Sequence, residues 1–420
     1  MENVLLKNIN NPGGHTLKNY LAGGGYEALK KTFKVTPDDI IQTMKDSHLR
    51  GRGGAGFPAG LKWSFIPKDP TVDKYVCCNA DEGEPGTFKD RGIIEYDPHL
   101  LIEGMIIAGY AIGAATSYIY IRGEFEFGAK RLEAAIAEAY DKGYLGKDIL
   151  GSGFSHDMYV HRGFGAYICG EETALLESIE GYRGQPKKKP PFPALSGLYS
   201  KPTIINNVET LACVPPIIAK GVEWFTSMGP EKSPGPKIFC VSGHVEKPGL
   251  YELPMGTTLR EIIFDHCGGI KDGKNFKAVI PGGVSAPLFK EDNLDISMDF
   301  DSVMAAGSML GSGAVIVMDE TTCMVKSAYI VNRFFSHESC GKCTPCREGT
   351  IWATKVLRRI EYGAGRPDDI ELLESICDKI FGRTFCALGD GAVMALRAFI
   401  NNFREEFKYH IENKKCMVQA

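Results

Sequence analysis

The 420-residue sequence has no large excess of charge of either sign, because its 48 Lys and Arg residues nearly balance its 52 Asp and Glu residues. No basic face or arm stands out, which argues against nucleic-acid binding and leaves small molecules and other proteins as expected partners. With 44% hydrophobic and 24% charged residues, the composition is that of an ordinary soluble globular protein. A chain of this length is too long for one core and should form about two to four domains.

Long uninterrupted apolar runs are also lacking. The most apolar region, residues 100–121, is broken by Glu103 and by three glycines, so we interpret it as a buried helix followed by a strand. The first residues carry no apolar stretch of the secretory type, and the 13 cysteines are not regularly paired. We therefore expect a reducing compartment, free thiols and no direct membrane insertion.

Three cysteines are present at a spacing that favours a shared inorganic ligand: Cys340, Cys343 and Cys346. The two-residue gaps allow one turn of backbone to direct all three sulfurs inward. Structural zinc usually has two separated pairs of ligands, whereas three thiols at this spacing with a distant fourth are typical of a 4Fe–4S cluster. The pattern favours iron–sulfur over zinc and indicates a chain that handles single electrons.

Two cysteines are candidates for the fourth ligand. Cys377 lies in residues 369–381, where apolar residues recur with helical spacing, so its thiol is expected to pack in a core. Cys386 lies in an aperiodic turn between two helical patterns, and such a turn can direct a sulfur toward a cluster. We therefore predict Cys386 as the fourth ligand.

A glycine-rich segment provides a candidate nucleotide loop. Four glycines within residues 51–56 leave backbone N–H groups accessible to a phosphate or a ring, and Lys62 adds positive charge. Gly51, Gly53 and Gly56 match the dinucleotide fingerprint, but that fingerprint has meaning between a strand and a helix. Here a helix precedes it: the second of two short helices expected in the lead-in, over residues 37–46, with Thr36 placed to cap it and Pro37 in its first turn. We expect a nucleotide-binding loop of another design, with a plain structural turn as the alternative.

A predicted strand over residues 74–78 leads directly into Asn79, Asp81, Glu82 and Glu84. Open α/β folds place ligand contacts at the carboxyl ends of buried strands. These side chains are therefore candidates for hydrogen bonds to ribose, ribityl and ring-edge groups. A solvated acidic loop is the alternative.

A second glycine-spaced turn enters a helix that should begin near Gly170. Glu171 and Glu172 follow, and their carboxylates are candidates to bind sugar hydroxyls or a carboxamide. The helix macrodipole alone also favours acidic residues at a helix start. Both interpretations remain open from the sequence.

The next segment, residues 182–203, is too rich in Pro and Lys for a helix or inner strand. Phe192, between prolines, is a candidate to stack on a purine, and an exposed basic loop is the alternative. Residues 204–210 are expected to start a helix, with Asn206 and Asn207 where a phosphate would sit.

The remaining pattern predicts three kinds of structure. Helices over 98–112 and 127–142 alternate with strands over 117–121 and 157–160, which argues for a parallel or mixed sheet. Two strands around a turn, a helix from Thr258 and a further strand then predict a compact β-rich module. Four helical stretches follow from about residue 325 and suggest a bundle around the cysteine loops.

Four motifs occur in one order: residues 50–63, 78–91, 167–175 and 338–347. Together they closely resemble the flavoprotein subunit of respiratory NADH:quinone oxidoreductase, complex I, often called the F or 51-kDa subunit. The resemblance implies an α/β protein with an atypical Rossmann-like FMN domain, a ubiquitin-like (SLBB, β-grasp) domain and a four-helix bundle with a 4Fe–4S cluster. The expected ranges are 1–48 for lead-in helices, 49–230 for the FMN- and NADH-binding domain, 237–322 for the ubiquitin-like domain and 325–420 for the bundle.

The resemblance also implies a set of site residues. By similarity, FMN would be held by Gly51, Gly53, Lys62, Asn79, Asp81, Gly170, Asn206 and Asn207. NADH would stack above it, using Phe57, Phe65, Glu84, Glu172 and Phe192. The same motifs add Glu82, Tyr167 and Glu171 to the expected cofactor-binding residues. The cluster ligands would be Cys340, Cys343, Cys346 and Cys386, in agreement with the spacing.

Three of these residues would take part directly in the reaction. Glu84 and Glu172 would position the nicotinamide, and Lys62 would stabilise charge on reduced flavin. NADH gives up two electrons as hydride and a cluster accepts one, while a flavin can do both. Gly83 stands where some relatives carry a bulkier residue, which would alter the nicotinamide pocket.

The resemblance implies partners and a location as well. Electrons would pass toward quinone through a thioredoxin-like 2Fe–2S subunit (24-kDa or E type) and a multi-cluster iron–sulfur subunit (75-kDa or G type). The chain would lie at the cytoplasmic side of the cell membrane, or on the matrix side in a mitochondrion, held there by other subunits.

Two other interpretations remain open. A diaphorase subunit of an NAD-linked hydrogenase or formate dehydrogenase is similar over the same core but often carries further cysteine-rich domains. A non-catalytic scaffold whose cysteines bind zinc would show neither flavin nor iron–sulfur absorbance.

Overall fold

A computed structural model describes residues 2–418 of the chain. The chain divides into two compact units. The first comprises residues up to Gly83, Thr87–Phe239 and Leu250–Thr257, and the second comprises Glu84–Gly86, Cys240–Gly249 and the chain from Thr258 onward.

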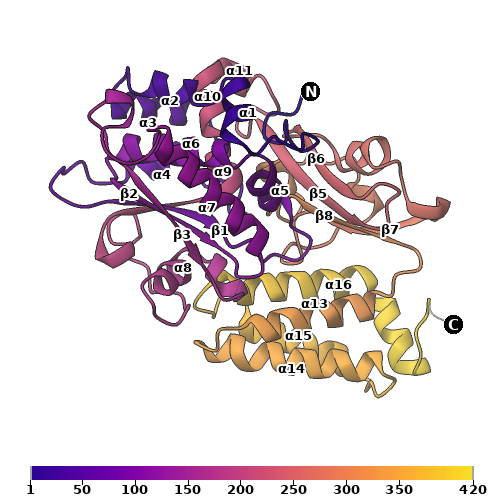
Figure 1. Cartoon of the computed structure of the whole chain (residues 1–420). Helices are drawn as coiled ribbons and strands as arrows, with labels where there is room; N and C mark the ends of the chain where they lie inside the picture. Colours follow the sequence, from indigo (N-terminus) through magenta and orange to yellow (C-terminus); the bar gives the residue numbers. More distant parts are fainter. Residues whose placement is uncertain (1, 419–420) are drawn as a thin grey trace. The chain divides into compact units, whose positions relative to one another are not determined.

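The first unit is built on a parallel sheet, as the alternating pattern predicted. Its strands are β1 (Tyr75–Ala80), β2 (Thr116–Ile121), β3 (Asp157–Arg162) and β4 (Thr203–Asn207). They lie in the order β3-β2-β1-β4, and Figure 1 labels β1, β2 and β3. Because all four strands are parallel, their carboxyl ends meet at one edge, where such sheets bind ligands.

Helices precede, connect and follow these strands in the chain. Those before β1 are α1 (Leu17–Ala22), α2 (Glu27–Thr32), α3 (Pro37–Asp46) and α4 (Ala59–Ser64). Those between β1 and β4 are α5 (Lys89–Tyr96), α6 (Pro98–Ile112), α7 (Glu126–Asp141) and α8 (Glu172–Ile179). Those after β4 are α9 (Val208–Ala212), α10 (Val214–Lys220) and α11 (Val222–Thr226).

Helix α6 explains the most apolar region of the sequence. All of its residues except Tyr110 are buried, and the helix contacts β1, β2 and several neighbouring helices. It is therefore a core helix followed by the strand β2, as predicted. No helix of residues 2–418 is long and apolar enough to cross a membrane.

The predicted cap of α3 is also confirmed. The Thr36 side chain accepts a hydrogen bond from the backbone N–H of Asp39, and the Asp39 carboxylate accepts one from the backbone N–H of Thr36. This reciprocal arrangement, with Pro37 in the first turn, fixes the start of the helix that precedes the glycine-rich loop.

The helix predicted over residues 204–210 was wrong in its first half. Residues Thr203–Asn207 form the strand β4, and the helix α9 begins only at Val208. A short apolar run cannot be assigned by periodicity alone, and the β-branched pair Ile204 and Ile205 fits a strand that pairs with β1. The lead-in segment also differs, since it contains three helices rather than two.

A second sheet follows in the chain. Its strands are β5 (Pro236–Gly243), β6 (Gly249–Pro254), β7 (Phe276–Ile280) and β8 (Ala314–Asp319), in the order β6-β5-β8-β7. The helix predicted from Thr258 is a short π-helical turn over Glu261–His266, and α12 (Phe300–Ala305) precedes β8. The predicted β-rich module is thus present.

Four helices complete the second unit, in agreement with the predicted bundle (Figure 1). They are α13 (Met324–Glu338), α14 (Thr344–Glu361), α15 (Asp369–Ile380) and α16 (Ala387–Asn413). Their buried faces carry mainly Val, Leu, Ile, Ala and Phe. Cys377 is one of these core residues, as its helical spacing predicted.

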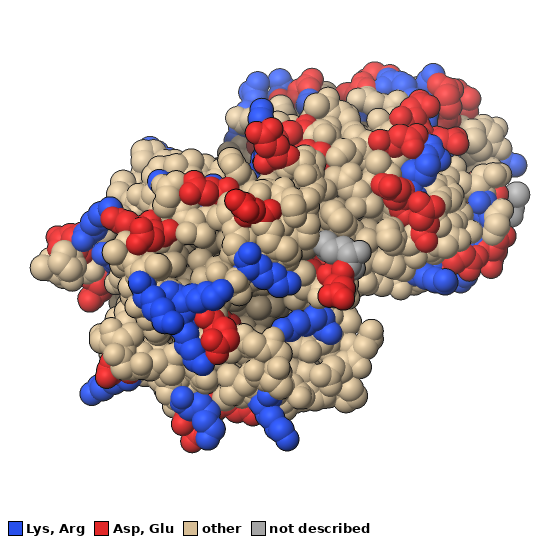
Figure 2. Space-filling view, turned by 90° about the horizontal axis from the view of Figure 1, so that it is seen from above, with Lys and Arg blue, Asp and Glu red and all other residues tan. Residues whose placement is uncertain are grey.

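The surface carries charges of both signs. On the face drawn in Figure 2, Lys and Arg side chains lie among Asp and Glu side chains and broad uncharged areas. This mixture fits the small formal net charge of -4.

Candidate functional site

The carboxyl edge of the parallel sheet brings together three of the predicted amides. Asn79 at the end of β1 lies in register with Asn207 at the end of β4, and Asn206 lies opposite Cys78. The Asn79 side-chain amide donates to the carbonyl oxygen of Gly170 at 2.8 Å. The predicted turn at Gly170 therefore contacts the strand ends.

The glycine-rich loop reaches the same edge. A Cβ atom added to Gly53 would lie 3.0 Å from the Asn207 Cβ, so the loop backbone contacts β4 closely. The loop lies between the helices α3 and α4, which confirms that a helix rather than a strand precedes it. Within it, the Gly51 N–H donates to the Phe57 carbonyl oxygen at 2.9 Å and closes the loop.

Lys62 on α4 connects the loop to the acidic turn. Its ammonium group donates to the Ile205 carbonyl oxygen of β4 at 2.8 Å and to the Glu172 carboxylate at 2.9 Å. The Lys189 ammonium group also donates to Glu172, at 2.7 Å. Burial alone would raise the pKa of Glu172, but the two ammonium groups outweigh it and hold the pKa below its usual value. Glu172 is thus an ionised acceptor fixed between two cations.

The neighbouring carboxylate of Glu171 has a different role. It is the N-cap of α8 and accepts hydrogen bonds from the backbone N–H groups of Thr173 and Ala174 at 2.9 and 3.0 Å. Its position is therefore explained by the helix start. Its contact with a cofactor stays a prediction.

Glu82 also completes a helix start. Its buried carboxylate accepts from the backbone N–H groups of Asp90 and Arg91, at the beginning of α5. Burial, reinforced by the Asp90 carboxylate, raises the pKa of Glu82 to about 7. The cofactor contact predicted for Glu82 is likewise untested by this geometry.

A buried charge network lies behind Asn207 and was not predicted. The Lys89 ammonium group donates to the Asn207 side-chain oxygen at 2.9 Å and to Asp90 at 2.7 Å, and it forms an ion pair with Glu209 at 3.0 Å. The Asn207 amide donates to Asp90 at 2.6 Å, and Lys237 pairs with Glu209 at 2.8 Å. One residue could have indicated this network: Glu209 is a charged residue within α9, a helix whose residues are all buried.

The predicted aromatic residues are exposed. Phe57 and Phe65 are about half exposed, with ring centroids 6.3 Å apart, and Phe192 is more than half exposed in its loop. Phe164, which the sequence did not single out, is 95% exposed in the glycine-spaced turn. Exposed rings are available for stacking on a planar ligand.

The remaining predicted residues have distinct surroundings. Tyr167 lies against Gly83, because a Cβ added to Gly83 would be 3.2 Å from the Tyr167 ring, so a bulkier residue there would press on Tyr167. Asp81 is buried near this turn, and its backbone N–H donates to the Asn79 side-chain oxygen. Glu84 belongs to the second unit, where the Ser285 N–H and hydroxyl both donate to its carboxylate at 2.8 Å.

The four predicted cluster cysteines lie at one end of the bundle. Cys343 and Cys386 are the N-cap residues of α14 and α16, Cys346 lies in the first turn of α14, and Cys340 follows the end of α13. The Phe385 backbone N–H donates to the Cys343 sulfur at 3.5 Å. Helix N-termini and N–H donors favour thiolates, as a metal cluster requires.

The four sulfurs face one another. Burial, reinforced by the neighbouring cysteines, raises the pKa of Cys386 to about 11, and burial likewise raises the pKa of Cys346 to about 11. The four thiols therefore lie close enough to interact with one another at one end of the bundle, as a shared ligand requires.

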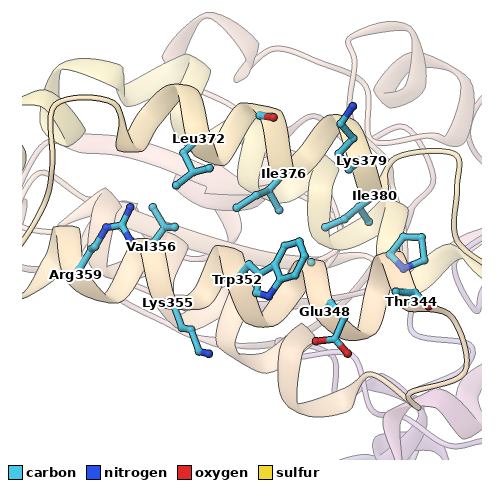
Figure 3. A pocket seen from close by; sticks show the side chains of 13 residues that line it. Thr344, Glu348, Trp352, Lys355, Val356, Arg359, Leu372, Ile376, Lys379 and Ile380 are labelled. Carbon is cyan, nitrogen blue, oxygen red and sulfur yellow. The ribbon is translucent and has the colours of Figure 1, made fainter.

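A separate groove lies between α14 and α15, and its volume is about 590 Å³ (Figure 3). The apolar side chains of Trp352, Ile376 and Ile380 form much of its wall, and Thr344 lies at the end next to Cys343. None of the predicted cofactor residues line it. This groove is therefore not the predicted nucleotide site.

Three family models match the chain. Residues 44–216 match the Nuo51 FMN-binding domain, residues 237–317 the SLBB domain, and residues 326–410 the NADH-ubiquinone oxidoreductase-F iron-sulfur binding region.

Similar proteins cover almost the whole chain. The F 2 subunit of NADH-quinone oxidoreductase from Rhizobium meliloti (strain 1021) is 62% identical over 416 residues, 99% of each chain. The F subunit of NADH-quinone oxidoreductase from Mycobacterium bovis (strain ATCC BAA-935 / AF2122/97) is 52% identical and covers 98% of this chain and 94% of its own. The crystal structure of an NAD⁺-reducing [NiFe]-hydrogenase matches with a TM-score of 0.84 and 35% identity, over 98% of this chain and 67% of that chain. The chain therefore belongs to the family of NADH-quinone oxidoreductase F subunits.

Proposed function

We propose that this chain oxidises NADH with FMN bound at the carboxyl edge of the β1–β4 sheet, and passes electrons singly to a 4Fe–4S cluster on Cys340, Cys343, Cys346 and Cys386. The observation that carries the proposal is the convergence of Asn79, Asn207, Lys62 and the Gly170 turn at one sheet edge. Bound FMN would supply the conversion between a hydride pair and single electrons, and the cluster would supply one-electron transport.

The chain's own residues would bind and orient the reactants. The backbone of residues 51–56 and the amides of Asn206 and Asn207 provide donors for a phosphate. Lys62 supplies a fixed positive charge beside the strand ends. Glu172, held ionised between two ammonium groups, would accept hydrogen bonds from the nicotinamide carboxamide. Exposed Phe rings would stack on the adenine.

We propose the electron acceptors as a thioredoxin-like 2Fe–2S subunit and a multi-cluster iron–sulfur subunit of complex I. Three of the four cluster cysteines are only partly buried, which supports an exit for electrons near the surface. Attachment at the cytoplasmic face of the cell membrane, or at the matrix face in a mitochondrion, would then depend on partner subunits.

The other two interpretations have less support. The hydrogenase chain is 35% identical and one third of it lies outside the match, whereas the Rhizobium meliloti relative is 62% identical over 99% of its length. A zinc scaffold on the four cysteines is disfavoured because residues 326–410, which contain all four, match the NADH-ubiquinone oxidoreductase-F iron-sulfur binding region.

The test compares Glu172→Gln with Glu133→Gln in the full-length chain purified with its companion subunits. Glu133 lies exposed on α7 and pairs with Arg162 at 2.9 Å, so it provides the same chemical change outside the proposed site. We expect both variants to keep FMN, and Glu172→Gln to change NADH affinity by about tenfold or more. Anaerobic NADH titration of the flavin absorbance gives the affinity. Loss of FMN from the wild-type complex, or equal NADH affinity in all three proteins, would overturn the proposal.

A further inference from the structure

Three helix ends meet in the second unit at a group of metal-ligating side chains that the proposed function does not use. Cys323 is the N-cap of α13, Glu361 is the last residue of α14, His410 lies in the last turn of α16, and Cys416 follows the end of α16. The ligand atoms of Cys323, His410 and Cys416 all lie within 4.8 Å of one another. Cys323 and His410 are buried, and Cys416 is partly buried.

The distances match the edges of a zinc tetrahedron. The Cys323 sulfur lies 3.5 Å from the His410 Nε2 and 3.9 Å from a Glu361 oxygen, and that oxygen lies 3.8 Å from the His410 Nε2. Zinc bonds of ordinary length give tetrahedral edges of about 3.5 Å for sulfur to nitrogen, about 3.6 Å for sulfur to oxygen and about 3.4 Å for nitrogen to oxygen. Small shifts of the Glu361 carboxylate would close the set.

The surrounding hydrogen bonds favour the metal-binding forms of two of the four side chains, His410 and Cys323. The His410 Nδ1 lies 2.8 Å from the Glu406 carbonyl oxygen. A carbonyl oxygen accepts only, so Nδ1 carries the proton and Nε2 presents its lone pair to the group. The Lys326 backbone N–H donates to the Cys323 sulfur at 3.4 Å, at the N-terminus of α13. Both the donor and the helix end favour a thiolate.

We propose that Cys323, His410, Cys416 and Glu361 bind one zinc ion. Two thiolates, an imidazole and a carboxylate are ligands that zinc accepts in tetrahedral geometry, and the bound ion would fix the start of α13, the end of α14 and the segment after α16 to one another. The site is separate from the four cluster cysteines. The helix α14 has 18 residues with Cys343 at its start and Glu361 at its end, so about 27 Å of helix separates the two.

The experiment counts metals in the full-length chain purified anaerobically with its companion subunits. We expect about one zinc per chain in addition to the iron, and a zinc X-ray absorption spectrum with two sulfur ligands at about 2.3 Å. Cys416 is the residue to change, because it lies after the last helix and is partly exposed. In Cys416→Ala, the zinc content should fall about tenfold while iron and FMN are retained.

Cys377→Ala is the matched control, because it removes a thiol from the same bundle without touching the group. It should keep its zinc. A wild-type protein without zinc, zinc retained in Cys416→Ala, zinc with no sulfur ligands, or a disulfide between Cys323 and Cys416 in the anaerobic preparation would each overturn the proposal. Zinc content and coordination are measured without any activity assay, so the outcome is independent of the proposed NADH oxidation.

Discussion

Replacing Lys89 by Met should strongly destabilise the first unit, because this side chain neutralises a buried carboxylate behind the candidate site. Lys89 is 1% exposed and lies 2.7 Å from Asp90 and 3.0 Å from Glu209. Burial alone would lower the pKa of Lys89, but the carboxylates of Asp90, Glu209 and Glu82 outweigh it and raise the pKa above its usual value. The ammonium group is therefore charged in the folded protein.

The expected loss of folding free energy follows from the buried carboxylate that Lys89→Met leaves without its ion pair. Met has a similar length and fills the space, so the cost comes mainly from the unpaired charge. Asp90 keeps the Asn207 amide at 2.6 Å but loses its ion pair, while Glu209 keeps Lys237 at 2.8 Å. Removing one partner of a buried pair costs about 3 to 5 kcal/mol, which lowers the Tm of a unit of this size by about 6 to 20 °C.

The assay is calorimetric unfolding of the full-length chain, with the flavin content measured in parallel. Lys68→Met is the matched control, since Lys68 lies 2.7 Å from Asp38, the same separation as in the buried pair, but both side chains are mostly exposed. It should change the Tm little. FMN retention should fall in Lys89→Met only, because Lys89 also holds the Asn207 side-chain oxygen.

A double variant separates charge from packing. Lys89→Met with Asp90→Asn removes both members of the pair and leaves an amide that can still accept from Asn207. The double variant should therefore be less destabilised than the sum of the single variants, by about 2 kcal/mol or more. Strictly additive effects, or equal effects of Lys89→Met and Lys68→Met, would refute the electrostatic reasoning.

Two further predictions concern the frame of the site. The raised pKa of Glu82 means that the folded protein holds a proton that the unfolded chain has lost, so this group's contribution to stability falls as pH rises from the usual value of 4.5 to about 7. Glu82→Gln should flatten this decline in denaturation series between about pH 5 and pH 8, and an unchanged slope would contradict the assignment. A Cβ on Gly60 would lie 2.4 Å from the Lys45 nitrogen, so Gly60→Ala should separate α3 from α4, cost about 1 to 3 kcal/mol and weaken FMN retention. The exposed neighbour Leu61→Ala is its control, and equal FMN content in both would argue against the reasoning.

Local signals in the sequence were sufficient for several elements. The cap at Thr36, the apolar run of α6 and the alternation of helices and strands each depend on residues close together in the chain, and the structure confirms them. Local signals were insufficient for β4. Its two isoleucines become a strand because β1 offers them a hydrogen-bonding partner, and that partner is more than 120 residues earlier in the chain.

The candidate site also combines features that are local in the sequence with features that join distant residues. The spacing of Cys340, Cys343 and Cys346 could be read directly, because one turn of backbone brings them together. The pairing of Lys62 with Glu172 could not, since 110 residues separate them. The group at Cys323 was missed for the same reason: His410 is 87 residues away, and the four side chains come from the ends of three different helices.

Adjacent residues of one motif serve the fold and the site separately, and this limits what a motif alone can identify. Glu171 and Glu172 are consecutive and chemically identical, yet one oxygen of Glu171 bonds to the first N–H groups of α8 while its other oxygen pairs with Lys189, and Glu172 extends to both Lys62 and Lys189. Glu82 likewise bonds to the start of α5. A carboxylate oxygen that is occupied by helix N–H groups has little capacity left for a ligand, whereas a carboxylate held through lysine side chains alone can exchange partners when a ligand arrives. The hydrogen-bond partner, rather than the residue type or its place in the motif, therefore separates the acidic residues that build the sheet edge from those available to bind a nucleotide there.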